Sequence, residues 1–453
     1  MIWNPNKECM SRDEMSALQG KRLHKIVEYV YHNVPFYRNK LQELDIRPDD
    51  IQTIEDIKKL PFTTKKDLRD NYPFGLQAAP QSEIIRVHAS SGTTGNPTIV
   101  GYTRKDIGVW SECMARCLTA YGVTRDDIFS VAYGYGLFTG GLGAHYGVEH
   151  LGASVIPAGT GNTEKHLKLI RDLGITGIAC TPSYALYLAE TMDKLGIRKE
   201  DIKLRVGAFG AEPWTEQMRQ EIEERLGLKG YNIYGLSEVM GPSVSYECQH
   251  QHGSHINEDH FYPEIINPTT LEPLPAGQTG ELVFTTLTKE GMPVLRYRTR
   301  DLCTLLPGTC DCGRTNIRMG RIEGRSDDML IMQTEKLEAA RDTEGRGKLR
   351  FSQTLINYLT GEEVAAADPN IVNNGINIIT PVSATHVMMK TGFSYLEDAR
   401  LRPGVEAEAL IESVYYGPLS QLISSIGMES GNTVVTMLGT AYHEKNIFAP
   451  RVF

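Results

Sequence analysis

The chain has 453 residues, of which 41% are hydrophobic and 23% are charged, and its formal net charge at pH 7 is −9. These values are typical of a globular protein with two or three domains. The negative charge argues against a general nucleic-acid-binding or anionic-membrane surface, so we expect neither partner. The sequence shows no basic-then-apolar leader pattern and no apolar run of membrane length, which predicts a cytoplasmic protein.

The first 75 residues favour a helical segment. Ser11 and Glu14 have the spacing of a capping box, in which each side chain satisfies a backbone N–H of the other's residue. Apolar residues follow at intervals of three and four to about residue 45. We therefore expect a helix that begins at Ser11.

A loop rich in glycine and hydroxyl side chains spans residues 90–97, between strand-like runs at Ile84–His88 and Thr98–Thr103. Glycines allow backbone N–H groups to approach an anion, and hydroxyls add hydrogen-bond donors. No Gly-Lys-Ser/Thr follows, so it is not a Walker loop. A phosphate cradle and a plain surface turn both fit this pattern. The candidate phosphate ligands are Ser90, Ser91, Gly92, Thr93, Thr94 and Gly95.

From about residue 84 to residue 235 the chain alternates strand-like apolar runs with amphipathic stretches. This alternation predicts an α/β fold, with a mostly parallel sheet covered by helices. Ligands of such sheets bind at the carboxyl ends of the strands. The predicted strands after the glycine-rich loop are Ile128–Tyr133, Ala153–Pro157, Thr176–Cys180, Val206–Gly210 and Tyr231–Tyr234.

Three short segments add candidate nucleotide contacts. The turn Gly210–Pro213 consists of small residues and Glu212, and a flat ring could lie against its backbone. The segment Tyr234–Glu238 offers an aromatic ring for a base and a carboxylate for Mg²⁺. Asp301 could accept hydrogen bonds from two ribose hydroxyls. Each segment alone has an ordinary structural explanation as a turn, a helix start or a core residue.

Beyond residue 257 the pattern changes. Short β-type runs such as Glu281–Thr286 alternate with Pro/Gly turns and indicate a β-rich subdomain over 257–320. Residues 321–331 are charged and glycine-containing, and we interpret them as a hinge that includes Asp327 and Asp328. In 332–453 we expect a smaller C-terminal region of uncertain fold. Strands are indicated there at Ile371–Thr380 and Thr433–Leu438, and an amphipathic helix at Leu419–Ile426.

Taken together and in this order, the motifs resemble the adenylate-forming superfamily, and more closely its phenylacetate–CoA ligase branch, over about residues 1–331. Several motifs in the same order are specific evidence for a family, whereas any one of them alone would be weak evidence. They are Ser-Ser-Gly-Thr-Thr-Gly-x-Pro at 90–97, Tyr-Gly-Tyr-Gly-Leu-Phe-Thr-Gly-Gly at 133–141, Gly-Ala-Glu-Pro at 210–213, Tyr-Gly-Leu-Ser-Glu at 234–238, Tyr-Arg-Thr-Arg-Asp at 297–301 and Gly-Arg-x-x-Gly-Arg-Ser-Asp-Asp at 320–328.

The resemblance implies an adenylation domain over residues 1–320 and an AMP-forming acid–thiol ligase. A phenylacetate-like acid, ATP and CoA would be its substrates, Mg²⁺ its cofactor, and a homodimer its assembly. Two alternatives stay open: an adenylyltransferase that forms no thioester, and a nucleotide-binding protein with impaired catalysis. The second follows from residues 332–453, because we can match none of them to the family's lysine-bearing C-terminal domain.

The resemblance also assigns roles to residues. Thr94, Glu238 and Arg321 would act in catalysis, with Glu238 holding Mg²⁺. An acyl pocket would be formed by Tyr133, Tyr135, Phe138 and Gly210. The implied nucleotide-binding residues are Ser90, Ser91, Gly92, Thr93, Thr94, Gly95, Ala211, Glu212, Pro213, Tyr234, Gly235, Ser237, Asp301 and Arg321.

Four further residues suggest a structural zinc site. Cys310 and Cys312 can place two thiolates on one ion, and Cys248 with a nearby histidine would complete a tetrahedral shell. We expect His255 as the fourth ligand because its surroundings resemble the branch pattern. His250 and His252 compete for that place. The alternative is a pair of reduced thiols on a surface turn.

Overall fold

The computed structural model describes residues 1–90 and 97–326 with side chains, and the backbones of strands at 330–341, 347–357, 363–366, 375–381, 386–393 and 411–418. The chain divides into two compact units. The first comprises Met1–Ile266, Pro273–Thr299 and Thr304–Arg321, and the second comprises Asn267–Glu272, Arg300–Cys303 and the chain from Ile322 onward.

The first unit begins with helices, as the sequence predicts. Helix α2 starts after Ser11, whose side chain accepts a hydrogen bond from the Glu14 N–H while the Glu14 carboxylate accepts one from the Ser11 N–H. Pro35 follows the end of α2 and opens the next helix, where its missing N–H costs nothing. The helices of this segment are α1 (Pro5–Glu8), α2 (Arg12–Asn33), α3 (Pro35–Glu43) and α4 (Lys65–Asp70), with 3₁₀ turns at Pro48–Asp50, Ile54–Lys59 and Gln81–Glu83.

A twelve-stranded sheet forms the centre of the fold, and its two halves differ. Strands β3 to β7 pair in parallel in the order β7-β6-β5-β3-β4, which confirms the predicted βα alternation. The other half continues with antiparallel pairs such as β7–β8, β8–β9 and β10–β11. The parallel strands are β3 (Ile128–Val131), β4 (Ser154–Ile156), β5 (Gly177–Cys180), β6 (Val206–Gly210) and β7 (Lys229–Leu236).

The second half carries the β-rich residues expected from about 257 onward. It runs in the order β10-β11-β12-β13-β9-β8, and β14 pairs with β12. Its strands are β8 (Gly241–Tyr246), β9 (Ser254–Ile256), β10 (Phe261–Ile266), β11 (Thr279–Thr286), β12 (Tyr297–Leu306), β13 (Arg318–Met319) and β14 (Gly324–Arg325).

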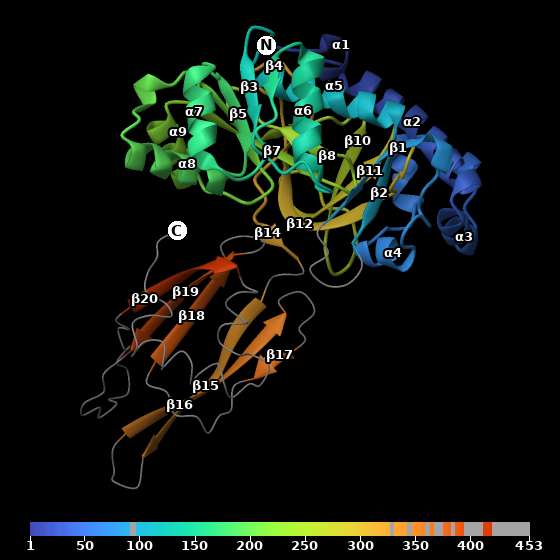
Figure 1. Cartoon of the computed structure of the whole chain (residues 1–453). Helices are drawn as coiled ribbons and strands as arrows, with labels where there is room; N and C mark the ends of the chain where they lie inside the picture. The colour runs from blue at the N-terminus through green and yellow to red at the C-terminus, as the bar shows by residue number, and fades with distance from the viewer. Residues whose placement is uncertain are drawn as a thin grey trace. The chain divides into compact units, whose positions relative to one another are not determined.

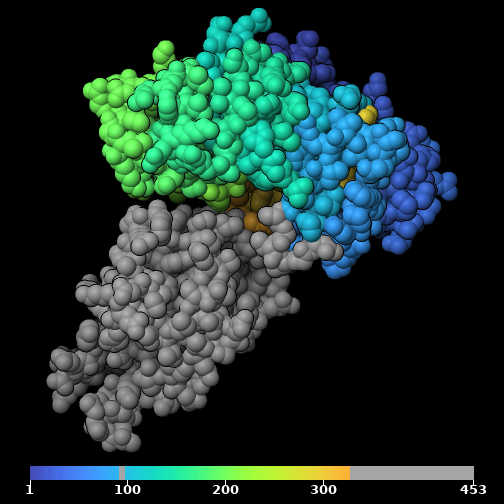
Figure 2. All heavy atoms as spheres, in the orientation of Figure 1, coloured from blue at the N-terminus to red at the C-terminus, as the bar shows by residue number. Residues whose placement is uncertain are grey.

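Helices cover both faces of the parallel half (Figure 1). In β5, Ile178 and Cys180 join one buried cluster with α7–α9, while Ala179 joins the opposite cluster with α5 and α6. This alternation follows from the two-residue period of a strand, so β5 must be apolar throughout. The covering helices, which form much of the face seen in Figure 2, are α5 (Arg104–Ala120), α6 (Thr139–Leu151), α7 (Thr163–Asp172), α8 (Pro182–Leu195) and α9 (Glu216–Leu226).

The second unit contains two three-stranded antiparallel sheets, β15-β16-β17 and β18-β19-β20. Strand β18 falls largely on the predicted strand Ile371–Thr380. The predicted strand Thr433–Leu438 and helix Leu419–Ile426 lie outside the described residues. The strands are β15 (Leu330–Arg341), β16 (Gly347–Asn357), β17 (Glu363–Ala366), β18 (Gly375–Pro381), β19 (His386–Phe393) and β20 (Ile411–Pro418). No helix in the described part of the chain is long and apolar enough to cross a membrane.

A buried ion pair joins the helices to the start of β10. Arg116 of α5 and Asp259 are each about 1% exposed and bond through two nitrogens and two oxygens. Arg22 of α2 also contacts Asp259, at 3.6 Å. Burial would raise the pKa of Asp259, but His260 and the two arginines outweigh it and lower that pKa below its ordinary value.

Changing Asp259 to asparagine should therefore lower the free energy of unfolding by about 3–5 kcal/mol, because the buried Arg116 and the partly buried Arg22 lose their carboxylate. Urea denaturation at pH 7 measures this loss. Since the folded-state pKa is depressed, the wild-type advantage is complete at neutral pH and shrinks as the pH falls below about 4. Lys66→Met is the matched control, because its pair with Asp70 is exposed on both sides and should matter by less than about 1 kcal/mol. An equal loss in both variants would contradict this prediction.

Candidate functional site

The glycine-rich loop projects from an antiparallel pair of strands, β1 (Ile84–Ala89) and β2 (Ile99–Thr103). A hydrogen bond of 3.0 Å from the Ser90 N–H to the Thr98 carbonyl closes its stem. The Ala89 N–H donates to the Leu137 carbonyl at 3.0 Å, which holds the stem against the segment after β3. The predicted phosphate ligands Ser91, Gly92, Thr93, Thr94 and Gly95 lie outside the described residues, so their roles stay predictions.

The carboxyl ends of three parallel strands meet at Tyr133. Its hydroxyl donates to the Cys180 carbonyl at 2.7 Å and lies 3.4 Å from the Gly210 carbonyl. The side chain is 6% exposed, and burial raises the pKa of Tyr133 well above its ordinary value. Tyr133 therefore ties the ends of β5 and β6 to the segment that carries the other predicted acyl-pocket residues.

The turn after β6 has an unusual backbone. A Cβ at Gly210 would overlap the Ile233 carbonyl oxygen of β7, so only glycine fits there. Ala211 has φ of 71°, a left-handed conformation that costs a non-glycine residue free energy. The Glu212 carboxylate accepts a hydrogen bond of 2.6 Å from the Ser183 N–H and thereby caps the start of α8. This helix-capping contact of Glu212 is one that the sequence did not predict.

The segment Tyr234–Glu238 ends β7 and turns into β8. Gly235 lies so close to Gly241 that a Cβ would overlap the Gly241 carbonyl, which explains the glycine. The half-buried ring of Tyr234 lies 6.4 Å from the ring of Phe284. The Ser237 hydroxyl bonds to Thr139 at the start of α6, at 3.3 Å.

Glu238 is 5% exposed, yet among the described residues no basic side chain forms an ion pair with its carboxylate. A buried carboxylate is costly unless a cation or donors compensate it. A buried carboxylate oxygen without an ion-pair partner is the kind of ligand that a hard divalent cation prefers.

A buried platform beneath this turn was not predicted from the sequence. The Tyr102 hydroxyl of β2 lies 3.0 Å from the Ser237 carbonyl and 3.1 Å from the Met240 carbonyl. The Lys289 ammonium donates to the Glu238 carbonyl at 3.0 Å and lies 4.8 Å from the centre of the Tyr102 ring. Burial lowers the pKa of Lys289 to about 8. The strand that follows the glycine-rich loop is thus bonded directly to the turn that carries Glu238.

Two of the predicted acyl-pocket residues, Tyr135 and Phe138, lie near the surface of the first unit, whereas Gly210 is buried at the end of β6. The Tyr135 hydroxyl lies 3.2 Å from Nδ1 of His145, and Phe138 is 43% exposed. The rings of Tyr133 and Phe138 are 6.4 Å apart. These residues share one segment, and the structure leaves Phe138 accessible to a ligand.

Two further predicted residues have local partners. Arg321 forms an ion pair with Glu216 at the start of α9. Asp301, in the second unit, lies 3.9 Å from Arg325 across the β12–β14 pair. Their proposed contacts with ribose or phosphate stay predictions, as does the hinge role of Asp327 and Asp328, which lie outside the described residues.

The four predicted zinc ligands come together. The ligand atoms of Cys248, His255, Cys310 and Cys312 all lie within 4.8 Å of one another. The Cys248 and Cys310 sulfurs are 3.7 Å apart, and the Cys312 sulfur is 3.4 Å from Nε2 of His255.

The surroundings of this cluster favour metal binding over two thiols on a surface turn. Three of the four side chains are buried, and Cys312 is partly buried. The hydrogen bond with Cys248, followed by that with His255, lowers the pKa of Cys312 below its ordinary value. The competing residues His250 and His252 are exposed and are not part of the cluster. The two cysteines of the turn before β13 thus meet two ligands from the region of β8 and β9.

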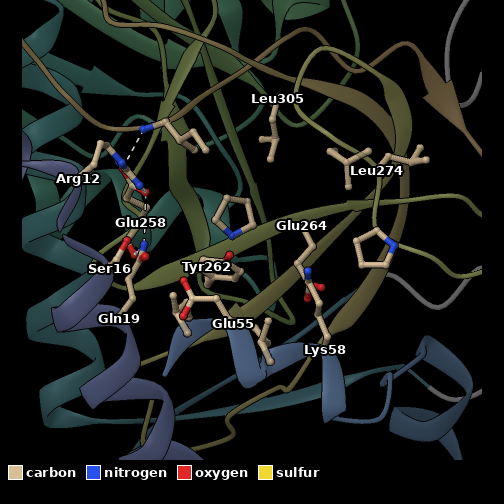
Figure 3. Close-up of a pocket in the computed structure, with 16 residues that line it drawn as sticks. Arg12, Ser16, Gln19, Glu55, Lys58, Glu258, Tyr262, Glu264, Leu274 and Leu305 are labelled. Carbon is tan, nitrogen blue, oxygen red and sulfur yellow. Dashed lines mark hydrogen bonds and ion pairs between the residues drawn. The ribbon is translucent and has the colours of Figure 1, made fainter. Parts of the chain in front are cut away.

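A separate pocket of about 330 Å³ lies between the N-terminal segment and β10 (Figure 3). Three of its charged residues are paired: Arg12 with Glu258, and Glu264 with the neighbouring Arg296. The first pair joins α2 to the segment before β10, and Arg296 also donates to the Lys58 carbonyl of the 54–59 turn at 3.3 Å. We therefore interpret the polar lining as structural.

Comparisons with known proteins agree with this arrangement. The family model described as AMP-binding enzyme matches residues 16–287. The phenylacetate-coenzyme A ligase of Thermus thermophilus is 54% identical over 334 residues, covering 74% of this chain and 75% of that protein. The ligase of the same name from Escherichia coli is 57% identical over 328 residues, covering 72% and 74%. A solved 2-hydroxyisobutyryl-CoA ligase in complex with 2-HIB-AMP and CoA superposes with a TM-score of 0.68 at 29% identity, covering 73% of this chain and 79% of that one.

Proposed function

Since the chain belongs to the AMP-binding enzymes and, within them, to the phenylacetate-coenzyme A ligase family, we propose that this AMP-forming acid–CoA ligase acts on phenylacetate or a similar aromatic acid. In the first half-reaction a carboxylate oxygen attacks the α-phosphorus of ATP, giving acyl-AMP and pyrophosphate. In the second, the CoA thiol attacks the acyl carbon and AMP leaves.

One observation carries the assignment of the site: the hydroxyl of Tyr102 bridges β2 to the carbonyls of Ser237 and Met240. It fixes the stem of the glycine-rich loop beside the turn of Glu238. Phosphoryl transfer depends mainly on positioning and on neutralising charge, so it requires such a fixed arrangement more than a protein nucleophile. The loop would hold the phosphates of ATP.

Glu238 is the proposed ligand of Mg²⁺, because its carboxylate is buried and, among the described residues, no basic side chain forms an ion pair with it. When bound, the ion would offset the repulsion between the attacking carboxylate and the phosphates. The chain's own contribution is to hold this carboxylate in place through the backbone of its turn.

The acid is proposed to lie against the segment after β3. Replacing Phe138 with alanine should raise the KM for phenylacetate about tenfold, because roughly 1–2 kcal/mol of apolar contact is lost, and should leave the KM for ATP unchanged. Steady-state kinetics separate the two constants. Leu137→Ala is the matched control, since Leu137 is 63% exposed and its backbone contact with Ala89 remains. A rise in the KM for ATP instead would place Phe138 outside the acid pocket.

The experiment for the activity is ATP–pyrophosphate exchange with the full-length chain and a panel of carboxylic acids. Exchange with phenylacetate, followed by AMP release that requires CoA, supports the ligase. Exchange without a thioester product would favour an adenylyltransferase. Tight AMP binding without exchange would favour a nucleotide-binding protein with impaired catalysis, the alternative raised by residues 332–453. Assembly as a homodimer and a cytoplasmic location remain predictions from the sequence.

A structural Zn²⁺ is proposed at Cys248, His255, Cys310 and Cys312. One imidazole and three sulfur ligands make a closed tetrahedral shell with no position left for a substrate. A neighbouring bond holds the turn of Cys310 and Cys312 in place. Arg314, two residues after Cys312, donates to the Glu8 carboxylate at 2.6 Å. The ion would bind the turn before β13 to the region of β8 and β9.

A further inference from the structure

Lys289 is a buried cation beside the turn that carries Glu238. Its side chain lies in the loop after β11 and is 1% exposed. Among the described residues, the ammonium donates one hydrogen bond, and its acceptor is the carbonyl of Glu238 itself, 3.0 Å away. Neither the glycine-rich loop nor the four-ligand metal cluster accounts for this residue.

The loop that carries Lys289 is fixed in place by a buried carboxylate. Asp106, which is fully buried, accepts hydrogen bonds from the Glu290 N–H at 2.7 Å and from the Gly291 N–H at 2.8 Å. The same carboxylate accepts a bond from Thr103 at the start of α5. A Cβ at Gly291 would overlap the Gly101 carbonyl of β2, so the loop lies directly on that strand. The ammonium therefore has little freedom to move away from the turn.

A buried ammonium group costs more free energy than a neutral donor that forms a hydrogen bond with the same carbonyl. Burying an ammonium costs several kcal/mol before compensation, whereas a neutral donor would bond the same oxygen. The compensation comes from the Tyr102 ring and from two buried carboxylates, since Asp106 and Glu238 both stabilise the charged form of Lys289. Lys289 thus acts electrostatically on Glu238 as well as on its backbone.

We propose that Lys289 is a positioning residue for adenylation: it holds the turn of Glu238 so that the carboxylate faces the Mg²⁺ of the ATP complex. The proposal rests on the proposed role of Glu238. Together with Tyr102, Lys289 bonds the three carbonyls of Ser237, Glu238 and Met240, so the turn is held from below. Removing the ammonium frees the central one of these three carbonyls.

The test uses the full-length protein and the variants Lys289→Met, Lys289→Gln, Glu238→Gln and Lys105→Met. Methionine removes the charge and the donor, while glutamine keeps a neutral donor and protects against a variant that folds poorly. Lys105 is the matched control, because it is an exposed lysine that pairs with Glu290 of the same loop. The first measurement is the Mg²⁺ concentration for half-maximal ATP–pyrophosphate exchange. The second is the rise in melting temperature caused by ATP with Mg²⁺, compared with ATP and EDTA.

The expected results separate the possible roles. Lys289→Met should raise the half-maximal Mg²⁺ concentration about five- to tenfold and remove most of the Mg²⁺-dependent melting shift. Lys289→Gln should give a smaller change, and Lys105→Met none. A lower melting temperature with an unchanged Mg²⁺ curve in both Lys289 variants would overturn the proposal and leave a purely structural role. An unchanged Mg²⁺ curve in Glu238→Gln would instead overturn the role of Glu238, and the positioning role with it.

Discussion

Replacing Glu238 with glutamine is expected to lower ATP–pyrophosphate exchange about 100- to 1,000-fold, the usual effect of removing one preorganised electrostatic contact from a transition state. The change removes the charge that would bind Mg²⁺ and keeps the shape of the side chain. AMP binding in the absence of Mg²⁺, measured by calorimetry, should change less than threefold. Initial exchange rates with phenylacetate measure the first effect.

The matched control for this change is Glu221→Gln on α9, whose carboxylate is 49% exposed and pairs with Arg225. It should exchange at the wild-type rate. A Glu238→Gln enzyme that keeps more than a tenth of the wild-type exchange rate would contradict the assignment of this carboxylate to the metal.

Replacing both Cys310 and Cys312 with serine is expected to remove one equivalent of zinc per chain and to lower the melting temperature by roughly 10 °C or more. The reason is that a structural zinc ion contributes folding free energy directly, and a loss of several kcal/mol shifts the midpoint of a large unit by that amount. Metal analysis of purified protein by mass spectrometry gives the stoichiometry, and differential scanning fluorimetry gives the midpoint.

Cys180→Ala serves as the cysteine control. Cys180 is fully buried in the cluster beneath α7–α9, outside the four-ligand group, so its replacement should cost some stability and no zinc. Equal zinc content in the double serine variant and the wild type would rule out the site. A second variant, His255→Ala, should lose zinc, whereas His252→Ala should keep it.

The sequence predicted those parts of the fold that depend on residues close together in the chain. The capping box at Ser11 forms because both partners lie within one turn of the chain. Strand β5 was predictable because a strand buried on both faces must be apolar throughout. Among the three candidate histidines, only His255 belongs to the four-residue cluster in the described part of the chain, and its role as a zinc ligand stays a prediction.

Contacts between distant segments account for what the sequence did not predict. The ammonium of Lys289 reaches a carbonyl 51 positions earlier in the chain, and the hydroxyl of Tyr102 reaches one 135 positions later. The spacing of apolar residues in the sequence does not reveal either contact. Each contact depends on how the strand or loop that carries the residue packs against a distant segment. The same holds for Glu212, whose carboxylate caps α8 although its position suggested a ligand contact.

The bond between Glu8 and Arg314 affects the order in which the first unit can fold while the ribosome makes the chain. The two residues are 306 positions apart, and both are almost completely buried. At about 5–20 residues per second, a ribosome needs roughly 15–60 s to deliver the arginine after the glutamate has been made. Until then the carboxylate of Glu8 lacks its guanidinium partner, and the turn that carries Cys310 and Cys312 has not yet been made. This contact of Glu8 is therefore among the last of the first unit to form, although Glu8 is among the first residues to be translated.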